Sequence, residues 1–353
     1  MPLYEMRKFV APEFIFGVNA RHRVGFYARN MMARRVFVVS DPGVIAAGWV
    51  KDVIADLTEV GIESVIFQEL TSNPKDHEVM AGAEIYARER CDVIVAVGGG
   101  SVIDCAKAIG IVHTNGGHIL DFEGADQIDI PGPPLICIPT TAGTAADISQ
   151  FCIIVNSPER YKMAIISKCM VPDVALVDPE TTLTMDTYLT ACTGIDALTH
   201  AIEAYDLPSR ENMLLGSLQA GLAFSNASLG AVHALAHALG GFLDLPHGEC
   251  NALLLEHVVR FNISKATDRY KQIGEAIGLE MAGINERQRA RRITEALNHL
   301  RNRLGIVNSL TQRGVRSADI PELAFHALND ACLVTNPRHA KIDDIKVIYG
   351  EAM

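Results

Sequence analysis

Side chains that could hold a metal ion gather in the second half of the sequence. Asp196 and His200 stand four residues apart in GIDALTHAIEAY, a segment of helical character, so both side chains share one helix face. His233 and His237 repeat this spacing in AVHALAHALGG, and His247 follows after a predicted break at the Gly-Gly pair. One such pair alone would more often be ordinary surface pairing. Three histidines within fifteen positions, beside an upstream Asp/His pair, instead indicate a metal centre.

The donor types narrow the chemistry of this centre. Carboxylate oxygen and imidazole nitrogen suit Fe²⁺, Zn²⁺, Mn²⁺ or Co²⁺, and the lack of a thiolate argues against a structural zinc site. A catalytic ion keeps one coordination position open, where it acts as a Lewis acid and lowers the pKa of a bound hydroxyl. An alcohol needs this before it can give up a hydride.

A glycine-rich turn could bind a phosphate in the first half of the sequence. Gly98, Gly99 and Gly100 follow a predicted strand and open the segment SVIDCAKAIG. We expect Ser101 to be the N-cap of this helix and Asp104 its capping-box partner. Glycines let a ligand approach the backbone, and the helix start attracts negative charge, so a pyrophosphate would fit. A tight turn without a ligand explains the glycines about equally well, because the motif is not G-x-G-x-x-G.

Two further turns could contact a dinucleotide. Asp41 ends the strand RRVFVVSD, where a carboxylate can accept the ribose hydroxyls of NAD and repel the 2′-phosphate of NADP. A helix cap before Pro42 is the competing interpretation. Thr140 and Thr144 lie in the turn PTTAGT after another predicted strand, where their hydroxyls could bind the cofactor or stabilise the turn.

These residues need elements that bring them together. From about residue 35, β-branched runs alternate with amphipathic helical stretches, which is typical of a doubly wound parallel sheet of the dinucleotide-binding type. After residue 179 the strands vanish and helical periodicity continues to the end. We therefore expect an α/β domain over 1–185 and an all-helical domain over 186–353, with a ligand cleft between them. The predicted strands lie in the runs 34–41, 63–70, 92–100, 134–141 and 174–180, with a hairpin over 151–167 and a long helix over 44–61.

Composition sets the class of protein. A chain of 353 residues is long enough for two cores, and a formal charge of −11 disfavours nucleic acid or an anionic membrane as partner. The first residues lack a secretory pattern, and no charge-free apolar run of membrane-spanning length follows. The eight cysteines form no Cys-x-x-Cys pair, which indicates reduced, buried thiols. We therefore expect a cytoplasmic protein that acts on a small molecule.

Five motifs in order resemble the iron-containing (group III) alcohol dehydrogenases: GGGSVIDCAKAIG, PTTAGT, GIDALTHAIEAY, GAVHALAHALGG and PHGECNALLLEHV. The resemblance implies a Rossmann-like N-terminal domain and a helical C-terminal domain. It also implies that NAD(H) and a divalent metal, Fe²⁺ first and Zn²⁺ second, meet in the cleft. An NAD-dependent alcohol dehydrogenase or aldehyde reductase for a small primary alcohol or diol is the implied activity. Relatives further suggest a homodimer or a larger homo-oligomer.

Carried onto this sequence, the resemblance gives each residue a role. His237 would line the site beside nicotinamide and substrate and relay a proton. Asn73, in TSNPKDHE, would face the cofactor side. The implied metal ligands are Asp196, His200, His233 and His247. The other implied cofactor contacts are Asp41, Gly98, Gly99, Ser101, Thr140, Thr144 and Lys162.

The chain also departs from the family pattern. Gly143 to Asp147 read GTAAD where the family usually has GTGSE, and His237 is followed by Ala238 where a proline is frequent. Only 206–209 stand between two helical stretches where relatives carry an extra segment, so either a deletion or an omitted stretch must be considered.

Other activities remain open at this point. A glycerol-type polyol dehydrogenase and a dehydroquinate synthase-like lyase share the same scaffold. A catalytically weakened member with a binding or assembly role is the alternative outside enzymes, and the departures from the family pattern motivate it.

Overall fold

The structure of the protein is a computed structural model. It describes residues 11–204, 220–222, 224, 229–306 and 309–353. The short connection over 206–209, and the helical stretch expected from Arg210, lie outside the described residues. Among the described helices, none has both the length and the apolar character that crossing a membrane would require.

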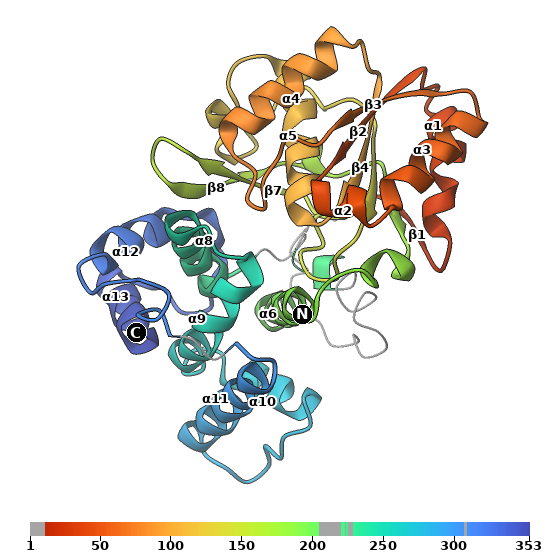
Figure 1. The fold of residues 1–353 in the computed structure, drawn as a ribbon. Coiled ribbons are helices and arrows are strands. Elements are labelled where there is room, and N and C mark those ends of the chain that lie inside the picture. The colour runs from red at the N-terminus through yellow and green to blue at the C-terminus, as the bar shows by residue number, and fades with distance from the viewer. Residues whose placement is uncertain (1–10, 205–219, 223, 225–228, 307–308) are drawn as a thin grey trace, which may run out of the picture.

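A parallel six-stranded sheet forms the centre of the first half, in the order β1-β9-β6-β4-β2-β3 (Figure 1). Every neighbouring pair in it runs parallel. The four inner strands of this sheet are almost continuously apolar because both of their faces are covered, as the sequence predicted. The strands are β1 (Glu13–Phe16), β2 (Arg35–Ser40), β3 (Glu63–Phe67), β4 (Val93–Gly98), β6 (Leu135–Pro139) and β9 (Val174–Val177).

Alternate residues of each strand pack under helices on opposite faces of the sheet. Phe37, Ile94 and Cys137 belong to the core beneath α4 and α5, whereas Val38 and Val95 belong to the core beneath α1 and α3. Figure 1 shows these helix pairs on the two sides of the sheet. The doubly wound arrangement is therefore confirmed. The helices are α1 (Val24–Asn30), α2 (Pro42–Ala46), α3 (Trp49–Glu59), α4 (Asp76–Arg88) and α5 (Gly100–Asn115).

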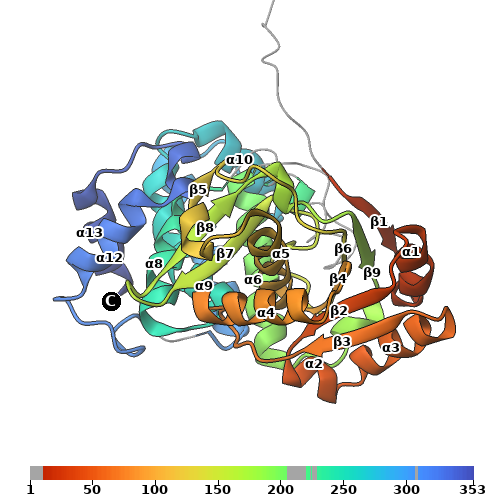
Figure 2. The ribbon, with the colours of Figure 1, turned by 90° about the horizontal axis from the view of Figure 1, so that it is seen from above.

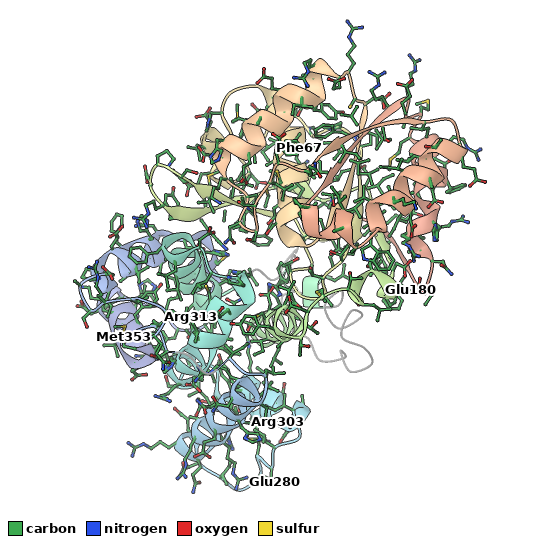
Figure 3. The ribbon with its side chains drawn as sticks, in the orientation of Figure 1. Phe67, Glu180, Glu280, Arg303, Arg313 and Met353 are labelled. Atoms are coloured by element: carbon green, nitrogen blue, oxygen red, sulfur yellow. The ribbon has the colours of Figure 1, made fainter. Side chains whose placement is uncertain are left out.

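Ionic and aromatic contacts fix the ends and centre of this half. Arg21 pairs with Asp178 at 2.6 Å and with Glu180 at 2.8 Å, which ties the segment after β1 to the end of β9. Phe67 stacks on Phe37 with ring centroids 5.9 Å apart. Figure 3 places Phe67 inside this half and Glu180 at its lower edge.

The predicted helix over 44–61 is wrong in one respect, because it is two helices. Gly48 separates α2 from α3 with a φ of +96°, a left-handed conformation that favours glycine. Hydrophobic periodicity runs through both helices, so it did not indicate that the first helix ends before Gly48. Strand β1, which was not predicted, is only four residues long and mostly exposed.

A small second sheet connects the halves. The predicted hairpin is confirmed as the antiparallel pair β7 (Phe151–Asn156) and β8 (Tyr161–Ile166), to which β5 (Gly124–Ala125) adds in parallel. β7 packs against α5 of the first half, and β8 packs against α8 of the second half. Figures 1 and 2 both show the hairpin between the two halves.

Every regular element described from residue 187 onward is helical. Their cores join into one apolar cluster. The last strand ends at Val177, ten residues before this run begins. The helices of this half are α6 (Thr187–Ala204), α8 (Ala231–Leu243), α9 (His247–Asn262), α10 (Thr267–Ala276), α11 (Glu286–Arg303), α12 (Ile320–Asn329) and α13 (Ile342–Ala352), besides the short 3₁₀ turn Ala331–Thr335.

The predicted break at the Gly-Gly pair is wrong. Helix α8 continues through Gly240 and Gly241 to Leu243. A Cβ on Gly241 would lie 2.6 Å from Cα of Tyr161, so this glycine lets strand β8 approach the helix closely. The pair therefore serves packing between elements, which local sequence does not reveal.

Candidate metal and cofactor site

A cavity of about 620 Å³ lies between the two halves. Its lining combines the strand ends and helix starts of the α/β half with α6, α8 and the start of α9. The carboxyl ends of parallel strands are the usual ligand-binding edge of such a sheet. Of the residues expected to act in the site, all but Gly98 line the cavity: Asp41, Asn73, Gly99, Ser101, Thr140, Thr144, Lys162, Asp196, His200, His233, His237 and His247.

Three of the four expected metal ligands, Asp196, His200 and His233, have donor atoms within 4.8 Å of one another, and His247 lies beside Asp196. Oδ1 of Asp196 lies 3.9 Å from Nε2 of His200 and 3.7 Å from Nε2 of both His233 and His247. Donors of one tetrahedral ion would lie roughly 3.4 Å apart, given metal–ligand distances of about 2.1 Å. The observed spacings are only slightly larger, so the donor set fits a divalent ion.

Three helices supply these donors. Asp196 and His200 share one face of α6, His233 comes from α8, and His247 is the first residue of α9. Asp196, His200 and His233 are at most 3% exposed, and the His200 and His233 rings stack with centroids 4.5 Å apart. Nδ1 of His200 lies 3.1 Å from the carbonyl of Gly143, the kind of partner that fixes the ring of a metal-binding histidine.

Burial and the neighbouring histidines shift the pKa of the Asp196 carboxyl in opposite directions. Burial would raise the pKa of Asp196, but the surrounding histidines, His200 foremost, hold it below its ordinary value. Burial lowers the pKa of His247 well below its ordinary value. A carboxylate that stays ionised beside a neutral imidazole is the protonation pattern that metal ligation requires.

His237 lies next to this cluster with a carboxylate partner of its own. Its Nδ1 is 2.8 Å from Oδ2 of Asp330, and its ring stacks on His247 with centroids 5.3 Å apart. Oδ1 of Asp330 accepts from the backbone N–H of Cys332 at 2.7 Å. Burial raises and His237 lowers the pKa of Asp330, with a net decrease. The sequence interpretation missed Asp330, which is 93 residues from His237.

Asn251 is a second residue that the sequence interpretation missed. Its Nδ2 donates to Oδ1 of Asp196 at 2.6 Å and lies 3.3 Å from Nε2 of both His233 and His247. Asn251 follows His247 by four residues on α9, so the same i, i+4 spacing that revealed the other pairs could have revealed it.

The glycine loop is packed more tightly than the sequence suggested. A Cβ on Gly99 would lie 2.9 Å from Cγ2 of Thr141, and one on Gly100 would lie 2.6 Å from Cγ2 of Thr144. These glycines therefore let the helix start press against the threonine turn. Gly98, whose Cβ would meet Val102, is the last residue of β4 and lies just behind the cavity.

The predicted N-cap at Ser101 is wrong. Gly99 is the N-cap of α5, and Gly100 is already helical. The hydroxyl of Ser101 instead donates to the carbonyl of Ser72. Because the N-cap is not Ser101, Asp104 is not its capping-box partner. Asp104 instead lines the cavity, and burial raises its pKa to about 7.

Asp41 and Asn73 both have protein partners at the cavity edge. Oδ1 of Asp41 accepts from the N–H of Val44 at 2.9 Å, so the helix-cap interpretation is confirmed. Nδ2 of Asn73 donates to Oδ1 of Asp244 at 2.6 Å, which joins the loop after β3 to the end of α8. One oxygen of each side chain has no role in these bonds.

The remaining expected cofactor contacts lie deeper. Thr140 is 5% exposed, and its N–H bonds to the carbonyl of Gly98. Oγ1 of Thr144 accepts from the N–H of Ala146, which supports the turn-stabilising alternative. Lys162 is 6% exposed, and burial lowers its pKa.

Comparison with known proteins identifies the family. The sequence profile described as "Iron-containing alcohol dehydrogenase" matches residues 11–179, and that of "Fe-containing alcohol dehydrogenase family, C-terminal" matches residues 206–353. The 1,3-propanediol dehydrogenase of Klebsiella pneumoniae is 36% identical, with 99% of each chain covered. The NAD-dependent methanol dehydrogenase of Bacillus methanolicus is 34% identical, with 98% of this chain and 99% of that protein covered.

Solved structures agree with these relatives. A crystal structure of 1,3-propanediol oxidoreductase superimposes with a TM-score of 0.92 at 35% identity, covering 99% of this chain and 100% of the other. The resemblance seen in the motifs is therefore confirmed, together with the fold and the NAD and divalent-metal cofactors that it implies. The chain belongs to the iron-containing alcohol dehydrogenase family.

Proposed function

We propose that this protein transfers hydride between a small primary alcohol or diol and NAD, with a divalent ion held by Asp196, His200, His233 and His247. The observation that carries the proposal is that these donors lie close together in a cavity that the glycine loop also lines. A nicotinamide and an alcohol bound there would lie side by side. The small diol and alcohol substrates named for the relatives support the same class.

The metal ligands and His237 have different roles in this proposal. A divalent ion, Fe²⁺ first and Zn²⁺ second, supplies Lewis acidity and makes a hydroxyl easier to deprotonate. Asp196 and the three imidazoles hold and orient the donor set. His237 relays the hydroxyl proton outward through Nε2, because Asp330 occupies its Nδ1. NAD bound in the cavity would supply the acceptor for the hydride of the carbinol carbon, and aldehyde reduction would use the same groups in reverse.

The cofactor occupies the α/β side of the cavity in this proposal. Gly99 and Ser101 lie at the start of α5, where backbone amides favour a pyrophosphate, and Gly98 precedes them at the end of β4. Asp41 keeps one carboxylate oxygen for the ribose, since the other caps α2. The other proposed contacts are Asn73, Thr140, Thr144 and Lys162.

The experiment that tests this function combines metal analysis with an alcohol panel. Purified protein is loaded with Fe²⁺ or Zn²⁺, and NADH formation is followed with methanol, ethanol, 1,3-propanediol and glycerol. We expect net NADH from a short alcohol or diol, loss of rate on chelation, and recovery on adding the ion back. A preference for glycerol would favour the polyol alternative. A metal-loaded protein that forms no NADH with any alcohol would contradict the proposal.

Three further expectations remain proposals. We place the domain boundary near residue 185, between the last strand and α6. The eight cysteines, all among the described residues, form no disulfide with one another, which supports a reducing compartment such as the cytoplasm. A homodimer is supported by the edge strand β1, where Phe14 is 40% exposed and Phe16 is 39% exposed. Light scattering in solution would test the dimer, and cell fractionation would test the location.

A further inference from the structure

One side chain contacts three of the four proposed metal donors at once. Nδ2 of Asn251, on α9, donates to Oδ1 of Asp196 on α6 at 2.6 Å. The same nitrogen lies 3.3 Å from Nε2 of His233 on α8 and 3.3 Å from Nε2 of His247 on α9. Asn251 is fully buried. It therefore joins the three helices at the point where their donors meet.

We propose that Asn251 is a positioning residue of the metal centre, which fixes the Asp196 carboxylate and so sets the affinity for the ion. The proposal rests on the proposed metal site, but it does not depend on which alcohol is oxidised. Partners in hydrogen bonds to ligating carboxylates and imidazoles orient the ligands and tune the metal.

The hydrogen-bond chemistry of an amide favours this role. An amide nitrogen only donates, and a carboxylate oxygen has two lone pairs, so Oδ1 of Asp196 can accept from Asn251 and still bind an ion. Each Nε2 has a single lone pair, which the ion would take. The amide therefore acts on the carboxylate of the donor set.

A purely structural role would leave a different pattern. Among the described residues, Oδ1 of Asn251 is buried without a hydrogen-bond partner. Asn262, on the same helix, shows the ordinary arrangement, because its amide donates to Asn336 at 2.9 Å and accepts from Asn336 at 2.8 Å. Buried polar groups are usually paired at both ends. The side chain of Asn251 is therefore oriented so that its amide nitrogen donates to Asp196, although its own carbonyl oxygen is left without a hydrogen bond.

The test compares two leucine variants of one helix. Asn251→Leu keeps similar volume and removes the amide, and Asn262→Leu does the same away from the donor set. Dissociation constants for Co²⁺ and Zn²⁺ are measured by competition with a chromophoric chelator. We expect about ten- to hundredfold weaker binding in Asn251→Leu and wild-type binding in Asn262→Leu. At saturating Co²⁺, the visible d–d bands of Asn251→Leu should also differ from those of the wild type.

The outcomes separate the proposal from its alternatives. Unchanged affinity with unchanged d–d bands in folded Asn251→Leu would overturn it, as would tighter binding or an equal loss in Asn262→Leu. If Asn251→Leu does not fold, the same affinities and d–d bands are measured for Asn251→Ala and Asn262→Ala, with the same expected results. Turnover is not used, so a protein that binds Co²⁺ normally and oxidises no alcohol would contradict the proposed function alone.

Discussion

The two ends of the cavity are built from different parts of the chain. At the cofactor end, the glycine loop and the threonine turn present backbone, and added Cβ atoms on Gly99 and Gly100 would collide with the turn. At the metal end, buried side chains from three helices converge. A backbone site depends on the absence of side chains, whereas a side-chain site depends on their identity. Substitutions should therefore separate cofactor binding from metal binding.

The largest separation is expected at the metal end. His200→Ala removes one donor of the ion and should lower kcat/KM about a thousandfold or more, since a Lewis acid contributes several kcal/mol at about 1.36 kcal/mol per tenfold. NADH affinity, measured by fluorescence titration, should change by less than about twofold, because no cofactor contact is lost. His299→Ala, an exposed residue of α11, is the control. Substantial activity in His200→Ala would show that the two ends are not divided in this way.

The reciprocal change is made in the glycine loop. In Gly100→Ala, the new Cβ would lie 2.6 Å from Cγ2 and 2.7 Å from Oγ1 of Thr144. Overpacking of about 1–3 kcal/mol should push the turn away and weaken NADH binding about tenfold, with metal content unchanged. Gly350→Ala on α13 is the matched control, since its Cβ would meet nothing within 4 Å. Normal NADH binding in Gly100→Ala would mean that the turn moves freely.

A smaller effect should appear with pH at the cofactor end. Burial raises the pKa of Asp104 to about 7, so this carboxyl is neutral below that pH and anionic above it. Its anionic form repels a pyrophosphate in the same cavity, and NADH binding should weaken by several-fold as the pH rises from about 6 to about 8. Titrations across this range would measure the change, and Asp104→Asn should flatten it. A pH dependence that survives in Asp104→Asn belongs to another group.

The smallest predicted effect concerns the departure from the family pattern. Ala145 stands where relatives usually have glycine, and its φ is +49°, in the left-handed region that disfavours a side chain. Ala145→Gly should therefore raise the free energy of unfolding by about 0.5–1 kcal/mol, with metal and NADH affinities unchanged. Thermal unfolding would measure it. A lower midpoint would show that packing of the buried methyl group outweighs the backbone strain.

Sequence patterns predicted what depends on local chemistry and periodicity. Apolar runs between amphipathic helices predicted the parallel sheet, and i, i+4 spacing predicted which side chains of α6 and α8 lie together. The hairpin followed from two β-branched runs separated by SPER. The site roles themselves remain predictions until metal and cofactor binding are measured.

Contacts between distant elements could not be predicted. The glycine pair of α8 marked a break in the sequence but a close approach of β8 in the structure. Ser101 had the chemistry of an N-cap, yet the N-cap is Gly99, two residues earlier, and the Ser101 hydroxyl bonds to Ser72. Asp330 reaches His237 only through the packing of the region after α12 against α8. Each of these depends on a neighbour far along the chain.

The most direct test of the metal centre is anomalous diffraction from crystals of the protein loaded with Fe²⁺ or Zn²⁺, measured at the absorption edge of the ion. We predict a single strong peak enclosed by Asp196, His200, His233 and His247. A peak at the neighbouring group of His237, Asp330 and Cys332 would contradict the assignment, since their donor atoms lie within 4.8 Å of one another, as do those of Asp196, His200 and His233. So would the absence of any peak among the four predicted ligands.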